Sequence, residues 1–377
     1  MAIKSNPFVY PYTPFHSLSD KRFQAKFHDL KSLSTAEIEK IIPHLSLDSL
    51  SQKDDPAKHI LKFLQSNSIR FGPLELTEDL HCYWIEKLNY FISQSLPIQF
   101  TILGFPFKIP VPLKTNRTHP DMGELLSLSH LEDICKTITK IYNPGAHISV
   151  FAEGVFGKFN GTAVEEYRNY KSTLDLFTKK FHLNHLSIHH LDEMEKLEPN
   201  FNNLFAAKVK EFTEGFSDGD KGISEKVQGT MESILRIVNT KTLHLSEETL
   251  MDVYNYSLPP EKVTPEISTT REYINRSAQN VIFNYLSYLS VRDDIQFLER
   301  TVPHGLSLTV SPKKFRLGIQ PISTDITKLP YHGVPVFHKA NHNFTIEYLI
   351  DIKRMKTEIT PVMWNSDPEK KPFYYEI

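Results

Sequence analysis

Apolar positions along this chain repeat at helical spacing in some stretches and at strand spacing in others. Residues 35–64 and 79–91 carry apolar side chains three and four positions apart, which predicts helices. The short apolar run 98–103, with a glycine directly behind it, is typical of a buried strand. A helical pattern over 121–141 and a second strand over 147–151 follow. Strand, helix and strand in this order predict a parallel pair with a right-handed crossover.

The second half of the chain continues the same alternation. The stretches that we expect to be mainly helical are 164–180, 192–257 and 270–289. The expected strands are 186–191, a hairpin of 306–310 with 316–319, and a second hairpin of 334–338 with 344–350. These elements predict an α/β protein with reactive groups at the carboxyl ends of parallel strands. At 377 residues the chain is long enough for two domains, or for one large domain with an appendage.

Composition and charge narrow the class of protein. The hydrophobic content of 40% and the charged content of 23% are ordinary for a soluble globular protein. A formal net charge of −2 gives no electrostatic reason to expect nucleic acid or an anionic membrane as a partner. No run approaches the roughly 18 apolar residues that span a bilayer, and the N-terminus lacks the apolar segment of a secretory leader. We therefore expect a cytoplasmic protein in which Cys82 and Cys135 are reduced and buried.

A proline-stiffened loop follows the first predicted strand and carries three cations, Lys108, Lys114 and Arg117. At the carboxyl end of a strand, such a cluster is suited to bind a phosphate or a carboxylate. The alternative is three solvated surface side chains. Directly behind the loop, Asp121 is either a helix cap or a ligand for a substrate amine or hydroxyl.

Two further residues are candidates for proton transfer. Glu153 follows the second strand and precedes a glycine, where an acid can act as a general base if burial raises its pKa. His332 lies beside Gly333 in a short turn before a predicted strand. It is either a hydrogen-bonded turn residue or a general acid or base facing the main site.

Histidines suggest a metal site, but their spacing does not require one. The cluster consists of His182, His185, His189 and His190, and it crosses a predicted helix–strand boundary. Two His-x-Asp pairs, His119 with Asp121 and His190 with Asp192, fit part of a non-haem iron triad. Such pairs arise easily by chance among 17 histidines, so we expect a polar loop and strand edge and no metal. The chain also lacks the glycine-rich and serine motifs of nucleotide-cofactor enzymes and serine hydrolases.

Four segments, in the same order along the chain, match sequence motifs of a known family. They are 97–110 with its Phe-Pro-Phe-Lys, 120–131 beginning Pro-Asp-Met-Gly-Glu, 142–148 with Tyr-Asn-Pro-Gly-Ala, and 331–334 with Tyr-His-Gly-Val. In these segments the chain resembles the isocyanide (isonitrile) synthases, a family that includes the pyoverdine and dityrosine biosynthesis proteins.

The resemblance implies a Rossmann-like, mostly parallel sheet with a helical N-terminal cover and a smaller, strand-rich C-terminal domain. The corresponding boundaries are 1–95 for the N-terminal arm and helices, 96–257 for the core, and 258–377 for the smaller α+β domain. The implied activity joins the amine of tyrosine or tryptophan to ribulose 5-phosphate, whose carbonyl carbon becomes the isocyanide carbon. It belongs to secondary metabolism, needs no cofactor, and is compatible with a downstream iron/2-oxoglutarate oxygenase in the same pathway.

The resemblance also assigns expected roles to individual residues. The catalytic candidates are Lys108, Asp121, Glu153 and His332, and the substrate-binding candidates are Lys114, Arg117, Glu124 and Phe107.

Two departures from the family pattern leave other functions open. Glu153 stands where members commonly have Asp, and Ser307 and Ser311 stand where Arg and His are usual. Losing a bidentate cation and an imidazole from one strand changes what a pocket can hold. The departures leave open a substrate other than tyrosine or tryptophan, or a non-catalytic protein that binds a sugar phosphate or an amino acid. The His-x-Asp pairs leave a non-haem iron oxygenase as the second alternative.

Overall fold

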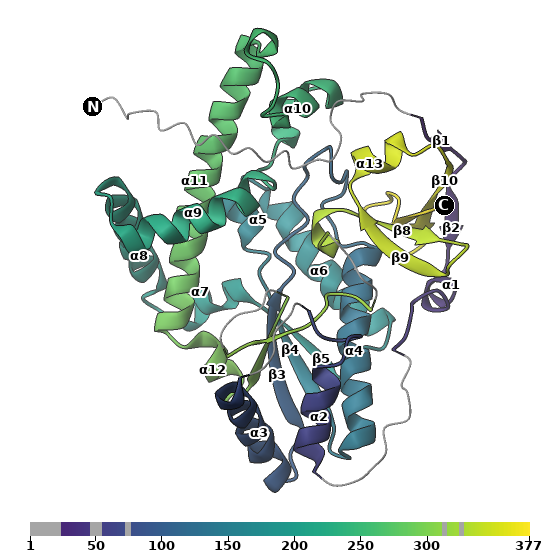
Figure 1. Ribbon diagram of the computed structural model, residues 1–377, viewed down its shortest axis with the longest axis vertical. Coiled ribbons are helices and arrows are strands. Elements are labelled where there is room, and N and C mark those ends of the chain that lie inside the picture. The colour runs from purple at the N-terminus through teal and green to yellow at the C-terminus, as the bar shows by residue number, and fades with distance from the viewer. Residues whose placement is uncertain (1–23, 46–54, 72–76, 311–314, 324–327) are drawn as a thin grey trace.

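Two β-sheets with helices around them make up the described part of the chain (Figure 1). The structure is a computed structural model that describes residues 24–45, 55–71, 77–310, 315–323 and 328–377. It confirms the predicted α/β class. None of the helices within these ranges has both the length and the apolar character needed to cross a lipid bilayer.

The first sheet has five strands, all parallel, in the order β5-β4-β3-β6-β7. The strands are β3 (Ile98–Gly104), β4 (Ala146–Ala152), β5 (Leu186–His190), β6 (Leu306–Thr309) and β7 (Leu317–Gly318). The chain moves outward from β3 to β5 and then returns to the other side of β3 with β6. The carboxyl ends of β3 and β6 therefore flank a topological switch point, where open α/β sheets bind their ligands. Figure 1 shows the carboxyl ends of β3 and β4 facing the middle of the molecule.

The central strands β3 and β4 are buried over almost their whole length. Helix α4 (Met122–Ile141) joins them, and α6 (Val164–Lys180) joins β4 to β5. Even their polar residues Thr101 and Ser149 are buried, as expected for parallel strands that are covered on both faces. The predicted parallel pair is confirmed, with Ile98 opposite Ala146 and Gly104 opposite Ala152.

Helices surround this sheet, and the long helix α11 (Pro265–Asp294) runs along one side of the molecule (Figure 1). The other α-helices are α1 (Thr35–Glu39), α2 (Pro56–Leu64), α3 (Glu78–Ser93), α5 (Phe156–Phe159), α7 (Met194–Leu197), α8 (Phe201–Ser217), α9 (Lys221–Leu235), α10 (Glu247–Tyr254), α12 (Phe297–Thr301) and α13 (Leu349–Arg354). Short 3₁₀ turns are η1 (Leu191–Glu193), η2 (Lys241–Leu243), η3 (Pro260–Lys262) and η4 (Pro330–His332). Tyr288 and Val291 of α11 pack against Phe151 of β4 in a cluster of buried apolar side chains, so α11 covers the face of the sheet that carries Phe151.

The second sheet is mixed and brings together strands from opposite ends of the chain (Figure 1). Its strands are β1 (Lys26–Phe27), β2 (Lys31–Leu33), β8 (Val334–His338), β9 (Asn343–Glu347), β10 (Glu358–Trp364) and β11 (Tyr374–Glu376). Both β1 and β2 pair with β10 in parallel. The sequence pattern gave no sign of this pairing, because two- and three-residue strands carry almost no periodicity. The division of the chain into parts 1–95, 96–257 and 258–377 remains a prediction.

The structure corrects three expectations. The hairpin of 306–310 with 316–319 is wrong, because Leu308 of β6 pairs with Leu317 of β7 in parallel; its turn, 311–314, lies outside the described residues. The second hairpin is confirmed as antiparallel β8 and β9, although 349–350 begin α13 instead of ending the strand. Both thiols are free, but only Cys135 is buried and Cys82 is exposed on α3.

Candidate active site

The ammonium group of Lys108 is buried between two carboxylates at the start of α4. Its Nζ lies 2.6 Å from Asp121 Oδ2 and 3.0 Å from Glu124 Oε2, and all three side chains are 0% exposed. The same Nζ donates to the carbonyl oxygens of Pro330 and Gly333, each at 3.4 Å. Lys108 therefore ties the loop after β3, the first turn of α4 and the turn before β8 to one point.

Local sequence explains why α4 begins here. Asp121 accepts a hydrogen bond from the backbone N–H of Gly123 at 2.8 Å, and Glu124 accepts one from the N–H of Asp121 at 3.0 Å. This is a capping box, so the expectation that Asp121 caps the helix is confirmed. The helix N-terminus also favours negative charge, which helps to keep carboxylates beside Lys108.

The loop that carries Lys108 has an unusual backbone. Phe105 and Phe107 have φ angles of 55° and 93°, in the left-handed region that side chains other than glycine rarely adopt. Burial holds them there: Phe107 is fully buried, with its ring 5.0 Å from that of Tyr170. The structure therefore places Phe107 in the packing beneath the site, and its predicted contact with substrate remains a prediction.

The Lys108 cluster holds more negative than positive charge if both acids are ionised. Burial raises the pKa of Glu124 to about 8; the charge of Asp121 adds to this effect and Lys108 opposes it. Glu124 therefore keeps its proton near neutral pH, while Lys108 and Asp121 form the ion pair. Within the described residues, Glu124 Oε1 and the hydroxyl of Tyr170 have no hydrogen-bond partner. Buried polar atoms left in this way are sites for water or a ligand.

The proton on Glu124 makes the free energy of unfolding depend on pH. The direction of this dependence follows from the raised pKa of Glu124. The folded state favours protonated Glu124, so its stabilisation is complete below the ordinary pKa of 4.5 and is lost as the pH rises to about 8. We expect the unfolding free energy of the wild type, relative to Glu124→Gln, to fall by a few kcal/mol between about pH 5 and pH 8.5. Urea unfolding at several pH values measures it. A pH-independent difference between the two proteins would contradict the assignment.

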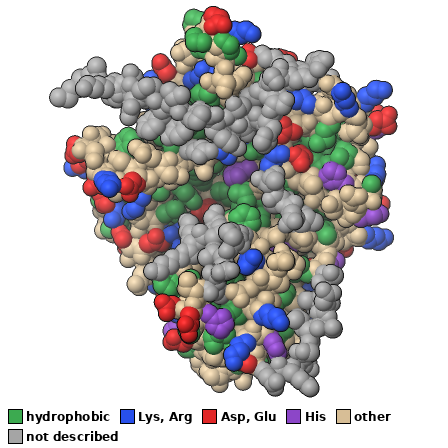
Figure 2. Space-filling view, in the orientation of Figure 1, with side chains coloured by type: hydrophobic (Ala, Val, Ile, Leu, Met, Phe, Trp, Pro, Cys, Tyr) green, Lys and Arg blue, Asp and Glu red, His purple; other side chains and the backbone are tan. Residues whose placement is uncertain are grey.

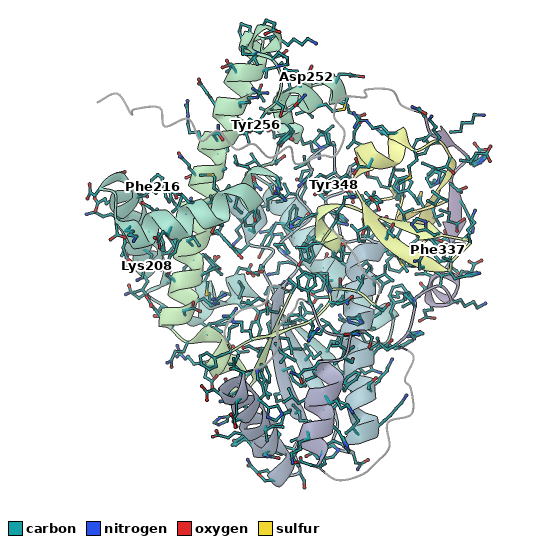
Figure 3. All side chains as sticks on the ribbon, in the orientation of Figure 1. Lys208, Phe216, Asp252, Tyr256, Phe337 and Tyr348 are labelled. Carbon is teal, nitrogen blue, oxygen red and sulfur yellow. The ribbon has the colours of Figure 1, made fainter. Side chains whose placement is uncertain are left out.

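Lys114 and His332 supply a second group of ionisable side chains. Burial, followed by the neighbouring charge of Arg236, lowers the pKa of Lys114 to about 7. Burial, with Lys114 and Lys108 nearby, lowers the pKa of His332 to about 3, so this imidazole is neutral at physiological pH. The ammonium groups of Lys114 and Lys328 lie 5.1 Å and 5.0 Å from the centre of the Tyr348 ring. Figure 3 shows Tyr348 near the middle of the molecule, where β9 meets α13.

The turn that carries His332 depends on Gly333. A Cβ on Gly333 would lie 2.5 Å from the carbonyl oxygen of Glu347 and 2.9 Å from a side-chain carbon of Ile346. We expect Gly333→Ala to lower stability by about 1–3 kcal/mol, because the overpacked turn must shift. It should also reduce any activity, since Gly333 contacts Lys108 through its carbonyl. Thermal unfolding tests this, with Gly229→Ala in α9, where a Cβ meets nothing within 4 Å, as the control expected to be neutral or stabilising.

Glu153 lies just beyond β4 and accepts a hydrogen bond of 2.6 Å from the hydroxyl of Tyr285 on α11. Tyr331 lies within electrostatic range of both Glu153 and Glu124, and burial raises its pKa further above the ordinary value. Tyr331 therefore links the Glu153 side of the site to the Lys108 cluster. In Figure 2, the face of the molecule in view is hollowed in the middle, with hydrophobic, acidic and histidine side chains around the hollow.

Both terminal nitrogens of Arg117 bind other parts of the protein. Its two terminal nitrogens bind the Asp367 carboxylate at 2.8 Å and 2.9 Å, and they also donate to the carbonyls of Pro120, Lys371 and Pro372. The side chain is 0% exposed. These contacts fix the segment before β11 against the loop, and the predicted role of Arg117 in binding substrate remains a prediction.

The histidine cluster does not converge on one point. His185 Nδ1 lies 2.7 Å from Glu132, and His189 stacks on Phe151. Asp121 is paired with Lys108, and Asp192 with Lys171. Across the described ranges, no three His, Cys, Asp or Glu side chains are grouped so as to hold a metal ion.

Sequence reasoning missed several residues that surround the site. They are Tyr170, Arg236, Tyr285, Arg292, Arg316 and Tyr331. Tyr331 belongs to a segment that was singled out for its neighbour His332. The others lie on helices or next to the end of a helix or strand and have no local motif, so only the three-dimensional arrangement identifies them. Of the two serines that depart from the family pattern, Ser307 has its hydroxyl 3.2 Å from that of Thr101 of β3, and Ser311 is outside the described residues.

Comparisons with known proteins find relatives named isonitrile synthases and a solved structure of similar fold. The L-tryptophan isonitrile synthase AmbI2 of Fischerella ambigua is 24% identical over 266 residues, covering 67% of this chain and 72% of that protein. The L-tyrosine isonitrile synthase of Pseudomonas aeruginosa is 27% identical over 258 residues, covering 67% and 73%. The crystal structure of PvcA from Pseudomonas aeruginosa has a similar fold, with a TM-score of 0.56, 23% identity, and coverage of 86% of this chain and 100% of that one. These relatives support an enzyme of the isocyanide synthase kind.

The family model described as pyoverdine/dityrosine biosynthesis protein matches residues 88–358. The match extends over β3, α4 and β4 and over the turn that carries His332, which are the elements that assemble the site. This chain therefore belongs to the pyoverdine/dityrosine biosynthesis protein family.

Proposed function

We propose that this chain is an isocyanide synthase that joins the amine of an amino acid to ribulose 5-phosphate, whose carbonyl carbon becomes the isocyanide carbon. The observation that carries the proposal is the buried Lys108–Asp121–Glu124 cluster, which can hold a proton near neutral pH beside the switch point of a parallel sheet. The strand order, renumbered along the chain, is 3-2-1-4-5, so we class the sheet as Rossmann-like.

Imine formation between an amine and a ketone needs proton transfer at two places. A base must remove a proton from the ammonium so that its nitrogen can attack, and an acid must protonate the oxygen that leaves as water. Glu153 is suited to the first task, whereas His332, whose lowered pKa makes it a weak base, is suited to hydrogen-bond the substrate as a neutral imidazole. Protonated Glu124 is suited to the second, and the Lys108 ammonium 3.0 Å away can stabilise the carboxylate that remains. The later carbon–carbon cleavage can use the same groups.

The sugar phosphate needs a cationic subsite. Lys114 and Arg236 lie within electrostatic range of one another beside His332, and a bound phosphate dianion would compensate their mutual repulsion. We assign the phosphate to this pair. No described residue group calls for a cofactor in this scheme, and the enzyme would act in the cytoplasm, upstream of an oxygenase that consumes the isocyanide.

The experiment is an incubation of purified protein with ribulose 5-phosphate, carbon-13 labelled at the carbonyl, and a pool of amino acids. Mass spectrometry should detect a product that is one carbon heavier and two hydrogens lighter than one amino acid, and that contains the label. Binding of the sugar phosphate without any product would instead favour a non-catalytic binding protein, for which the serine at position 307 gives a reason.

A further inference from the structure

Arg316 directly precedes β7, the strand that pairs with β6. Leu308 of β6 pairs with Leu317 of β7, so Arg316 is next to Ser307 across the two strands. Ser307 in turn pairs with Thr101 of β3. Residues that are level with one another on neighbouring strands project from the same face of a sheet. Arg316 therefore belongs to the face on which the Thr101 and Ser307 hydroxyls meet.

Two guanidinium groups, those of Arg316 and Arg292, lie near two carboxylates, and one of these carboxylates is already bound to Arg292. Its guanidinium lies within electrostatic range of Arg292, Asp293 and Glu153, and burial together with Arg292 lowers its pKa. Asp293 already accepts two hydrogen bonds from Arg292, at 2.8 Å and 2.7 Å. Within the described ranges, the Arg316 side chain itself makes no hydrogen bond or ion pair.

Arg292 contributes to the same site from the end of α11. It is only 4% exposed, and its hydrogen bonds to Asp293 hold it in place. The Tyr285 hydroxyl, nearly two turns earlier on α11, orients Glu153. The result is a partly buried pair of guanidinium groups with a fixed carboxylate beside it.

We propose that Arg316, supported by Arg292, binds the carboxylate of the amino-acid substrate while Glu153 receives its ammonium group. This assignment rests on the proposed function and deepens it. An α-amino acid carries its two opposite charges on one carbon, which matches a guanidinium next to a carboxylate. A phosphate dianion would be repelled by Glu153, which is the reason for assigning the phosphate to Lys114 and Arg236 instead.

Calorimetric binding of L-tyrosine and L-tryptophan, each compared with its amine, tyramine or tryptamine, tests the proposal directly. Any other amino acid that binds is compared with its own decarboxylated amine in the same way. We expect the wild type to bind the amino acid about 10–100-fold more tightly than the amine, as for one hydrogen-bonded charge pair. Arg316→Gln should lose this preference, and Arg316→Lys should recover part of it. Arg168→Gln, on an exposed part of α6, is the matched control.

The outcomes separate this inference from the proposed function. If Arg316→Gln folds, as judged by circular dichroism, and keeps the preference for the carboxylate, the role of Arg316 is wrong while isocyanide formation can still stand. A wild type that forms the isocyanide but binds amine and amino acid equally well also overturns it. If the wild type binds no amino acid and forms no product, both proposals fail. An unchanged affinity of Arg316→Gln for ribulose 5-phosphate is expected, and a large loss of that affinity would assign Arg316 to the phosphate instead.

Discussion

Replacing Lys108 with methionine is expected to abolish product formation and to destabilise the fold. Methionine keeps most of the length of the side chain but removes the charge, leaving the Asp121 carboxylate buried without a cation beside protonated Glu124. Breaking a buried ion pair by removing one partner costs about 3–5 kcal/mol. If the cluster also transfers protons during catalysis, the rate should fall by a further factor of about 10²–10⁴. Chemical unfolding and the mass-spectrometric assay measure the two effects separately.

A second substitution distinguishes stability from chemistry. In Lys108→Met combined with Asp121→Asn, no ionised side chain remains in the cluster, because Glu124 keeps its proton, and asparagine is also a favoured cap for α4. We expect this double variant to recover a large part of the lost stability and none of the lost activity. Activity that returned together with stability would show that Lys108 only holds the fold together, and activity retained in the single variant would remove its catalytic role.

The part of the site that sequence could predict is the part built from contiguous segments. The apolar run of β3, the capping residues Asp121 and Glu124, and the apolar run of β4 each carry their signal within a few residues. Because parallel strands place their carboxyl ends at one edge, the strand–helix–strand pattern was enough to place the Lys108 loop and Glu153 at the same edge of the sheet. These elements and the parallel pairing are confirmed.

The rest depends on contacts between distant segments. Tyr285 meets Glu153 from a helix whose local pattern reports only that one face is apolar. The parallel pairing of β6 with β7 was taken for a hairpin, because two short strands close in sequence usually form one. Small strands such as β1 pair with β10 through backbone groups that leave no side-chain pattern. In each case the missing information is tertiary packing, which overrides local preference.

The second large effect is expected from Arg117, whose guanidinium holds together parts of the chain 250 residues apart. Arg117→Met leaves the Asp367 carboxylate, which is 4% exposed, without its bidentate partner. We expect a loss of about 3–5 kcal/mol in the free energy of unfolding. Lysine at this position should recover little, since it cannot bind a carboxylate through two parallel hydrogen bonds. Arg168→Met, on an exposed part of α6, should change stability by no more than about 0.5 kcal/mol.

The same residue was predicted to bind substrate, and a double-variant cycle separates that role from the structural one. Arg117→Met with Asp367→Asn removes both buried charges, so it should be more stable than Arg117→Met alone. If Arg117 acts only by fixing the segment before β11 against the loop, the double variant should recover a nearly normal KM for both substrates along with its stability. If the guanidinium also binds substrate, KM for one substrate should stay raised by about tenfold or more in the stable double variant, because no partner for that substrate's anion has been restored. The engagement of both terminal nitrogens of Arg117 by Asp367 and three backbone carbonyls favours the first result. The substrate anions would then depend on Lys114 and Arg236 at one end of the site and on Arg316 at the other.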